Sequence, residues 1–127
     1  MTIASLSGLL RQFAAERDWE QFHTPKNLVM ALTGEVGELT ELFQWLTPAE
    51  SADIMADDEM AVRVREEIAD VLAYLLRLAD VLAIDLDSAL TDKIAKNAAK
   101  YPVDTSRSVA TKYTDLPAPN GRCWFST

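Results

Sequence analysis

The sequence has few of the residues that build several common kinds of protein and site. Its 127 residues include one cysteine, Cys123, and one histidine, His23. A single cysteine excludes a disulfide within the chain and a cysteine-rich zinc site, and it favours a reducing compartment. The histidine-containing ligand sets of zinc and di-iron bundles are equally out of reach. A metal site in this chain would therefore use oxygen ligands.

Positive charge and long apolar runs are also scarce. Lysine and arginine total 12 against 20 aspartate and glutamate residues, which gives a formal net charge of −8. This charge repels a phosphate backbone, so we expect no nucleic-acid partner. No apolar run approaches membrane-spanning length, and the first residues lack the features of a signal peptide. We therefore expect no membrane association and a cytoplasmic location.

The residues that are present describe one ordinary all-α domain. Hydrophobic residues make up 49% of the chain and charged residues 25%, which is typical of a globular protein. Apolar residues recur at helical spacing, and no strand-like alternation of useful length occurs. The sequence predicts a four-helix bundle-like fold. The expected helices span about 3–13, 25–45, 59–82 and 86–100.

Local signals set the ends of these helices. Thr24 followed by Pro25 is typical of a helix start, because the missing N–H of a first-turn proline costs nothing. The last helix should end before Pro102, since proline disfavours helix in the residue before it. The acidic segment 46–59 is interpreted as a connecting loop with room for a helical turn. Residues 105–127, rich in serine, threonine and proline, are predicted to be an extended tail.

Two of the predicted helices carry carboxylates within their apolar stripes. In the second helix Glu35 lies in the middle of a leucine stripe, and Glu38 borders the same stripe one turn later. Glu67 and Asp70 have the equivalent places in the third helix. An ionised carboxylate buried without a partner costs several kcal/mol, so these side chains need compensating positive charge.

A divalent cation supplies that charge better than the nearby basic side chains. Lys26, Arg63, Arg65 and Arg77 project mainly away from these faces. The E-x-x-E and E-x-x-D spacings place carboxylates one helical turn apart, and two facing helices would enclose an ion between them. All-oxygen ligands favour Mg²⁺ or Mn²⁺. The alternative is that the carboxylates line solvated faces or pair with basic residues across the bundle.

The fourth predicted helix carries groups that suit phosphate oxygens. Lys93 and Asn97 lie within its apolar stripe, and Lys100 and Tyr101 follow at its end. Lysine can bind phosphate as a point charge, and asparagine can orient it through its amide. The alternative is that the lysines bury their stems and reach water with their amines.

Aromatic side chains flank the second predicted helix. Trp19, Phe22 and His23 precede it, and Trp45 closes it. Tryptophan and histidine can stack on a nucleobase and hydrogen-bond to it. Simple core filling is the alternative, and it is at least as good an explanation for Phe22. Together the acidic, basic and aromatic groups suggest a metal-bound nucleoside polyphosphate.

These residues closely resemble those of the MazG-like nucleotide pyrophosphatases, particularly the dCTP pyrophosphatase branch. The similarity runs from about Phe13 to Pro117 and includes the two acidic motifs, the loop aromatics, "KIAKNAAKYP" and "KYTDLP". It implies a Mg²⁺-dependent hydrolase, with Mn²⁺ as a substitute, that converts a (d)NTP and water to a (d)NMP and pyrophosphate, preferring dCTP or a modified dCTP. It also implies a homo-oligomer, a dimer of dimers, with sites where helices of neighbouring subunits meet.

The resemblance also implies roles for particular residues, and residues 1–104 would form the catalytic domain. The implied metal ligands are Glu35, Glu38, Glu67 and Asp70. One of these, or Glu41 or Glu66, would accept the proton of the attacking water. The predicted substrate-binding residues are Trp19, His23, Trp45, Tyr74, Lys93, Asn97, Lys100 and Tyr101. Two alternatives remain: the same reaction on another nucleotide such as dUTP or dATP, and a non-catalytic helical assembly module.

Overall fold

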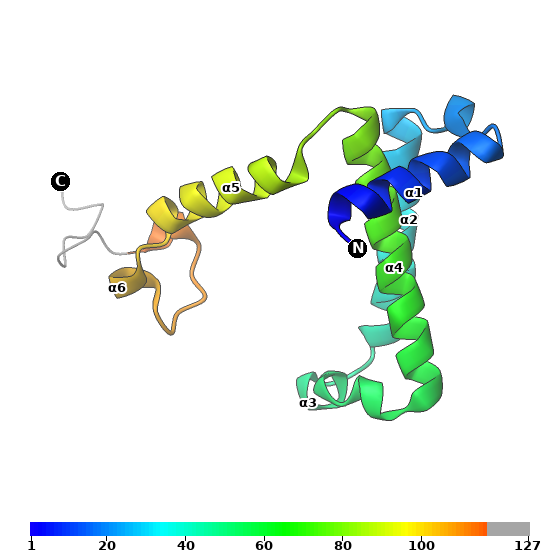
Figure 1. The fold of residues 1–127 in the computed structure, drawn as a ribbon. Helices are drawn as coiled ribbons and strands as arrows, with labels where there is room; N and C mark the ends of the chain where they lie inside the picture. Colours follow the sequence, from blue (N-terminus) through cyan, green and yellow to red (C-terminus); the bar gives the residue numbers. More distant parts are fainter. Residues whose placement is uncertain (117–127) are drawn as a thin grey trace. The chain divides into compact units, whose positions relative to one another are not determined.

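The computed structural model describes residues 1–116, and no strand occurs among them. The helices are α1 (Ile3–Glu16), α2 (Pro25–Phe43), α3 (Pro48–Ala52), α4 (Asp58–Val81), α5 (Leu86–Lys100) and α6 (Val103–Ser106) (Figure 1). Single 3₁₀ turns are η1 (Glu20–Phe22), η2 (Ile54–Ala56) and η3 (Tyr113–Asp115). The predicted all-α class is confirmed. In this part of the chain no helix is long and apolar enough to cross a membrane.

Capping side chains begin the long helices close to where the sequence predicts. The Thr24 hydroxyl accepts the Asn27 N–H at 3.2 Å, and Pro25 is the first residue of α2. Asp57 accepts the N–H groups of the first turn of α4 in the same way. α5 has the predicted bounds, whereas α2 ends at Phe43 rather than at Trp45.

The segment between α2 and α4 is more ordered than the predicted connecting loop. α3 begins with a capping box, in which the Thr47 hydroxyl accepts the Glu50 N–H at 3.2 Å and the Glu50 carboxylate accepts the Thr47 N–H at 3.0 Å. Ile54 of η2 is buried against Leu42 and Val64. The predicted room for a helical turn is filled by a short helix and a 3₁₀ turn. Caps and one buried apolar residue stabilise these short elements, although apolar residues do not recur at helical spacing in this segment.

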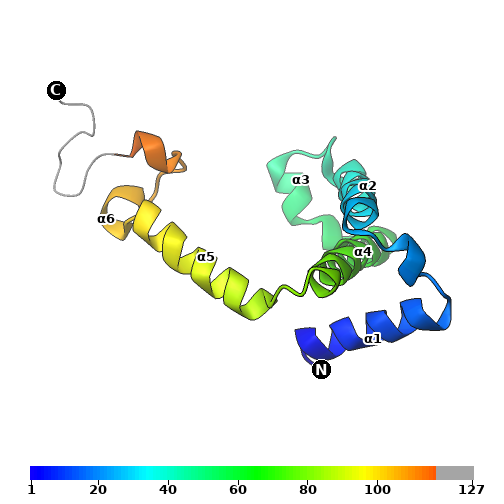
Figure 2. The same cartoon turned by 90° about the horizontal axis from the view of Figure 1, so that it is seen from above.

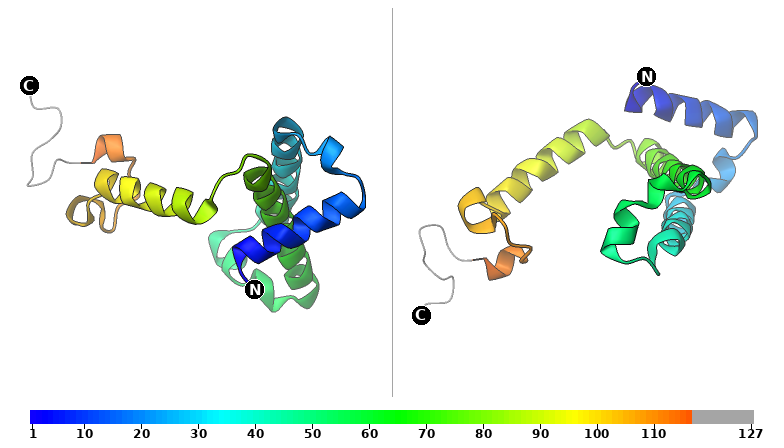
Figure 3. Two further views of the ribbon diagram at one scale, coloured as in Figure 1. Left: turned by 45° about the horizontal axis from the view of Figure 1, so that its top comes forward. Right: turned by 90° about the horizontal axis from the view of Figure 1, so that it is seen from below.

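Residues 1–84 form one compact unit in which α4 is central. α2 packs along one side of α4 (Figure 2), and α1 crosses α4 elsewhere on its surface (Figure 3). The buried apolar residues of this unit are small or branched and come mostly from these three helices. They are Ala14, Leu28, Leu42, Ile54, Ala61, Val64, Leu76 and Ala79. The α2–α4 pair is therefore the scaffold for anything that lies between those helices.

Residues 85–127 form a second unit, described as far as residue 116. Asp85 caps α5 by accepting the N–H groups of Asp87 and Ser88 at 3.0 and 3.3 Å. After α5 the chain continues through α6 and η3, which fall partly within the predicted tail. The rest of that tail, with Cys123, lies outside the described residues. A domain boundary at residue 104 stays a prediction.

Candidate metal centre and nucleotide site

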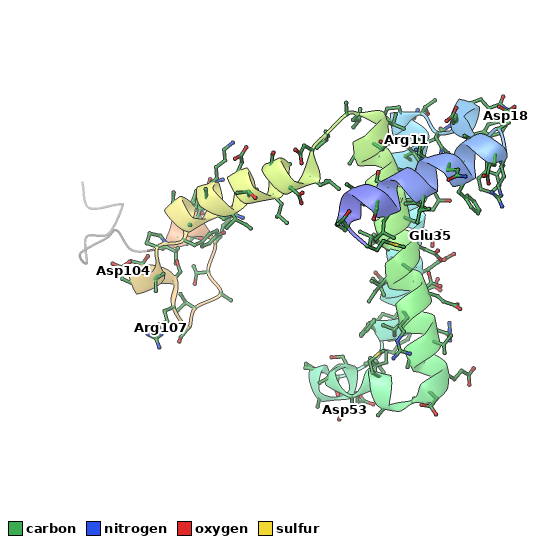
Figure 4. The ribbon with its side chains drawn as sticks, in the orientation of Figure 1. Arg11, Asp18, Glu35, Asp53, Asp104 and Arg107 are labelled. Carbon is green, nitrogen blue, oxygen red and sulfur yellow. The ribbon has the colours of Figure 1, made fainter. Side chains whose placement is uncertain are left out.

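Three carboxylates from α2 and α4 converge at one place. One carboxylate oxygen from each of Glu35, Glu38 and Glu67 lies within 4.8 Å of the other two. Glu35 and Glu67 are half-buried, and Glu38 is exposed. Figure 4 shows Glu35 beside α4, midway along the helix pair. Three of the four predicted metal ligands are thus brought together by helix packing.

The apolar stripes of the two helices hold these carboxylates in place. Leu28 and Leu42 lie one heptad before and after Glu35, and both are buried, with exposed fractions of 1% and 7%. On α4 the buried Val64 precedes Glu67 by one turn. Apolar contacts above and below therefore keep the helices close, and the acidic side chains between them cannot move apart without breaking those contacts.

Two oxygens of this cluster are buried without compensation. Glu35 Oε2 and Glu67 Oε2 have no hydrogen-bond partner among the described residues. The ion pairs found in the same part of the chain join arginines to Glu16 and Asp80, and none reaches the cluster. Pairing with basic residues, the alternative that the sequence allowed, is therefore not observed in residues 1–116. A buried acceptor without a donor is costly, so the cluster requires another partner.

The pKa shifts within the cluster also indicate that its negative charges require a positive partner. Burial raises the pKa of Glu35 above its ordinary value, and Glu38, Asp70 and Glu67 raise it further. Burial also raises the pKa of Glu67, as do Glu38 and Asp70, whereas Arg63 acts in the opposite direction. Asp70 is therefore coupled to the cluster through its charge, although its oxygen is not among the three that converge. A bound cation would reverse this effect and favour the ionised carboxylates.

The residues fit a divalent cation. Mg²⁺ and Ca²⁺ bind oxygen ligands at about 2.0–2.6 Å, so ligand oxygens up to about 5 Å apart can share one ion. The three converging oxygens meet this condition, and the two uncompensated oxygens offer lone pairs. Glu41 and Glu66, the other predicted proton acceptors, are exposed and lie outside this trio.

The predicted base-binding side chains divide into two groups within residues 1–84. Trp19 and His23 lie together, with ring centroids 6.5 Å apart, and Trp19 also meets Phe13 edge to face at 5.8 Å. Trp45 follows α2 and is 87% exposed. Core filling within residues 1–84 does not explain Trp45, nor does it explain Phe22, which is also exposed.

Tyr74 lies on α4 one turn after Asp70 and is half-buried. Two predicted metal ligands, Glu67 and Asp70, lie on the same helix within two turns of Tyr74. A contact between Tyr74 and substrate stays a prediction.

The predicted phosphate-binding residues belong to the second unit. Lys93, Asn97 and Lys100 are exposed on α5, and Tyr101 caps its end. Tyr101 meets Tyr113 edge to face at 6.0 Å, and Lys100 Nζ lies 4.8 Å from the Tyr113 ring centroid. Sequence reasoning missed Tyr113, although it lies within the family-like segment "KYTDLP". An approach of these groups to the carboxylates stays a prediction.

Sequence reasoning also missed Arg77. It is correctly placed away from the carboxylates, but it is buried and its Nε donates a hydrogen bond to His23 Nδ1 at 3.3 Å. The available signal was an arginine alone within the apolar run "YLLRLA". A charged residue in such a run requires a polar partner, which only the fold identifies.

The chain is similar to known proteins of one family. The model of the MazG-like family matches residues 31–116. A rat protein named dCTP pyrophosphatase 1 is 49% identical over 116 residues, which cover 91% of this chain and 68% of the relative. The human protein of that name is 47% identical with the same coverage. The crystal structure of a pyrophosphatase from Archaeoglobus fulgidus matches with a TM-score of 0.72 and 43% identity, covering 78% of this chain and 91% of that one.

The raised carboxyl pKa values predict how stability depends on pH without a divalent cation. The pKa values of Glu35 and Glu67 are higher in the folded chain than in the unfolded chain, so their contribution to stability is present below the ordinary carboxyl range. It is lost as the pH rises through the raised values. In EDTA, the melting temperature should therefore fall as the pH rises above the ordinary carboxyl range. Mg²⁺ should restore it above that range.

Glu35→Gln removes one of the repelling charges while keeping the side-chain shape. We expect this variant to melt higher than the wild type in EDTA near neutral pH and to gain less from Mg²⁺. Glu66→Gln, which changes an exposed glutamate of α4 beside the cluster residue Glu67, is the matched control. Circular dichroism at fixed protein concentration measures all three proteins. Wild-type melting that is unaffected by EDTA would contradict a cation site at Glu35.

Proposed function

The chain belongs to the MazG-like family, and on that premise we propose that it is a nucleoside triphosphate pyrophosphohydrolase. The observation that carries the proposal is the convergence of Glu35, Glu38 and Glu67, with two buried oxygens that lack partners among the described residues. A site of this kind suits a substrate that arrives with a cation, because the polyphosphate of a nucleotide brings one with it. The relatives named as dCTP pyrophosphatases support the same reaction.

The proposed reaction converts a (d)NTP and water to a (d)NMP and pyrophosphate. The water oxygen forms a bond to the α-phosphorus, and the bond from that phosphorus to the bridging oxygen of the β-phosphate breaks. Pyrophosphate leaves with the electron pair of that bond. One carboxylate accepts the proton of the water, and the candidates are Glu35, Glu38, Glu67, Asp70, Glu41 and Glu66.

The proposed cofactor is Mg²⁺, with Mn²⁺ as a substitute, held by Glu35, Glu38, Glu67 and Asp70. When bound, it supplies neutralisation of phosphate charge and a lower pKa for a coordinated water. The oxygen-only ligand set supports this choice of ions over zinc. The half-burial of Glu35 and Glu67 supports it further, since partial exclusion of water strengthens electrostatic interactions.

We assign binding of the base and of the triphosphate to separate groups of residues. Trp19, His23 and Trp45 bind the base by stacking and hydrogen bonding, and Tyr74 contacts the substrate. Lys93 and Lys100 attract the triphosphate, with Asn97 and Tyr101 as hydrogen-bond donors. The preferred substrate is dCTP or a modified dCTP, which the names of the curated relatives support. The alternative is the same reaction on dUTP or dATP.

We propose that the chain works as a homo-oligomer, a dimer of dimers, that shares its sites between subunits. The outer faces of α2 and α4 support this, because they expose large apolar side chains that packing within residues 1–84 leaves uncovered. These residues are Val29, Met30, Val36, Ile68, Leu72 and Leu75. A cytoplasmic location and the absence of nucleic-acid and membrane partners stay predictions of the sequence.

Replacement of one carboxylate in either acidic motif should abolish the reaction. Glu38→Ala and Asp70→Ala each change an exposed carboxylate, so helical content should be unchanged while pyrophosphate release from dCTP and Mg²⁺ is lost. Glu16→Ala, which changes an exposed carboxylate of α1, is the control. A wild-type protein that releases no pyrophosphate from a panel of nucleotides would instead favour the non-catalytic assembly module.

Trp45→Ala should separate base stacking from packing. Trp45 is 87% exposed, so its truncation should cost little stability. Loss of stacking on a base is worth about 1–3 kcal/mol, so the KM for dCTP should rise roughly fivefold or more. The KM for a poor substrate such as dATP should change less. An equal change for every base would show that Trp45 does not contribute to base preference.

Ile68→Glu tests the proposed assembly. Ile68 is 52% exposed on α4, and a charge there should disrupt an apolar contact between copies. Light scattering coupled to gel filtration should show a smaller species than the wild type. Gln12→Glu places the same charge on an exposed polar position of α1 and should keep the wild-type mass. A wild-type protein that is monomeric at micromolar concentration would contradict the assembly.

A further inference from the structure

An arginine and a histidine that are distant in sequence form a direct contact near the end of α4. Arg77 is 6% exposed, and its Nε donates a hydrogen bond to His23 Nδ1 at 3.3 Å. Its guanidinium also donates to Asp80 Oδ2 at 3.0 Å. Asp80 accepts a second arginine, because Arg11 donates to both of its oxygens. Figure 4 shows Arg11 where α1 crosses α4.

The direction of the hydrogen bond determines the state of the histidine. An arginine has five N–H donors, has no acceptor and stays charged in proteins. His23 Nδ1 must therefore present its lone pair to Arg77 rather than a hydrogen. The single hydrogen of the neutral imidazole is then on Nε2.

The charges that face His23 favour the same state. Burial lowers the pKa of His23 below its ordinary value, the positive charge of Arg77 on α4 lowers it further, and Glu20 of η1 acts in the opposite direction. Asp80 offsets the charge of the buried Arg77, and Arg11 binds the outer side of Asp80. The His23 ring also meets the Trp19 ring edge to face, with centroids 6.5 Å apart.

We propose that Arg77 is a positioning residue that holds His23 as a neutral imidazole with its hydrogen on Nε2, so that His23 presents one fixed donor to the pyrimidine base. This proposal rests on the proposed function. Cytosine has acceptors at O2 and N3, whereas uracil and thymine carry a hydrogen at N3. A histidine that cannot move its hydrogen to Nδ1 cannot accept that hydrogen through Nε2. When the Nε2 hydrogen meets N3 of the base, the contact therefore favours cytosine over uracil, because O2 is an acceptor in all three bases.

Asp80 completes this arrangement by keeping the guanidinium in position. A buried arginine without a partner is strongly destabilising, and Asp80 supplies the partner one turn along α4. Arg11 binds the same carboxylate from α1 but makes no hydrogen bond to His23. Arg11 therefore offers a matched control, since its removal weakens the same network without taking away the donor to His23.

Nuclear magnetic resonance can observe His23 without ambiguity because it is the only histidine in the chain. Long-range ¹H–¹⁵N spectra of the full chain report both the tautomer and the pKa of that ring. We expect the wild type to show hydrogen on Nε2 and to protonate below the ordinary histidine range. Arg77→Met should give a mixture of tautomers and a higher pKa. Arg11→Met should leave both properties as in the wild type.

Steady-state kinetics should show the consequence for the base. A lost neutral hydrogen bond corresponds to a roughly two- to tenfold rise in the KM for dCTP in Arg77→Met. We expect a smaller change in the KM for dUTP and little change in kcat. The preference for dCTP over dUTP should therefore decrease. Circular dichroism verifies that the variant is folded. A uniform fall in kcat for both nucleotides would indicate a merely structural role and overturn the proposal.

The wild-type spectrum decides the proposal even if Arg77→Met does not fold. Hydrogen on Nδ1 of His23 in the wild type would overturn it, as would an Arg77→Met spectrum identical to that of the wild type. These results are distinct from a failure of the proposed function, which would appear as absence of pyrophosphate release by a wild type with the expected spectrum. In that case the donor at His23 has no nucleotide to bind, and the assignment to base preference is wrong.

Discussion

Repulsion between carboxylates held together by apolar packing is the constraint on which the rest of the structure depends. The leucines of α2 and the valine of α4 bring the two helices together, and this brings Glu35, Glu38 and Glu67 within 4.8 Å of one another. Contacts that stabilise the fold therefore create an electrostatic cost at its centre. A bound cation lowers that cost, so packing and ligand binding are coupled through the same pair of helices.

The two charged clusters of residues 1–84 differ in whether their buried polar groups have partners within the chain. At the end of α4, Arg77 is compensated within the chain by Asp80, and its Nε donates a hydrogen bond to His23. Midway along α2 and α4, Glu35 Oε2 and Glu67 Oε2 have no hydrogen-bond partner among the described residues. The first arrangement produces a fixed donor, and the second produces an open acceptor. These are the two properties that recognition of a base and of a metal-bound polyphosphate require.

The exposed apolar faces of α2 and α4 give the same helices a further role. Side chains such as Val36 and Ile68 are half in water although the opposite faces of their helices are packed. A helix pair this apolar on its outer surface suits assembly with further copies. The proposed assembly would cover these outer faces and bring further copies close to the acidic cluster. One pair of helices can thus serve packing, cation binding and subunit contact.

Local patterns in the sequence determined most of the secondary structure and the identity of the acidic residues. Helical periodicity and the caps at Thr24 and before Pro102 identified the long helices, and Glu35 and Glu67 stood out because they interrupt apolar stripes. Only the tertiary structure decided which oxygens converge, that the charge of Asp70 raises the pKa of Glu35, and that Arg77 meets a histidine 54 residues away. The physical reason is range: periodicity and capping depend on neighbouring residues, whereas these contacts depend on how whole helices pack.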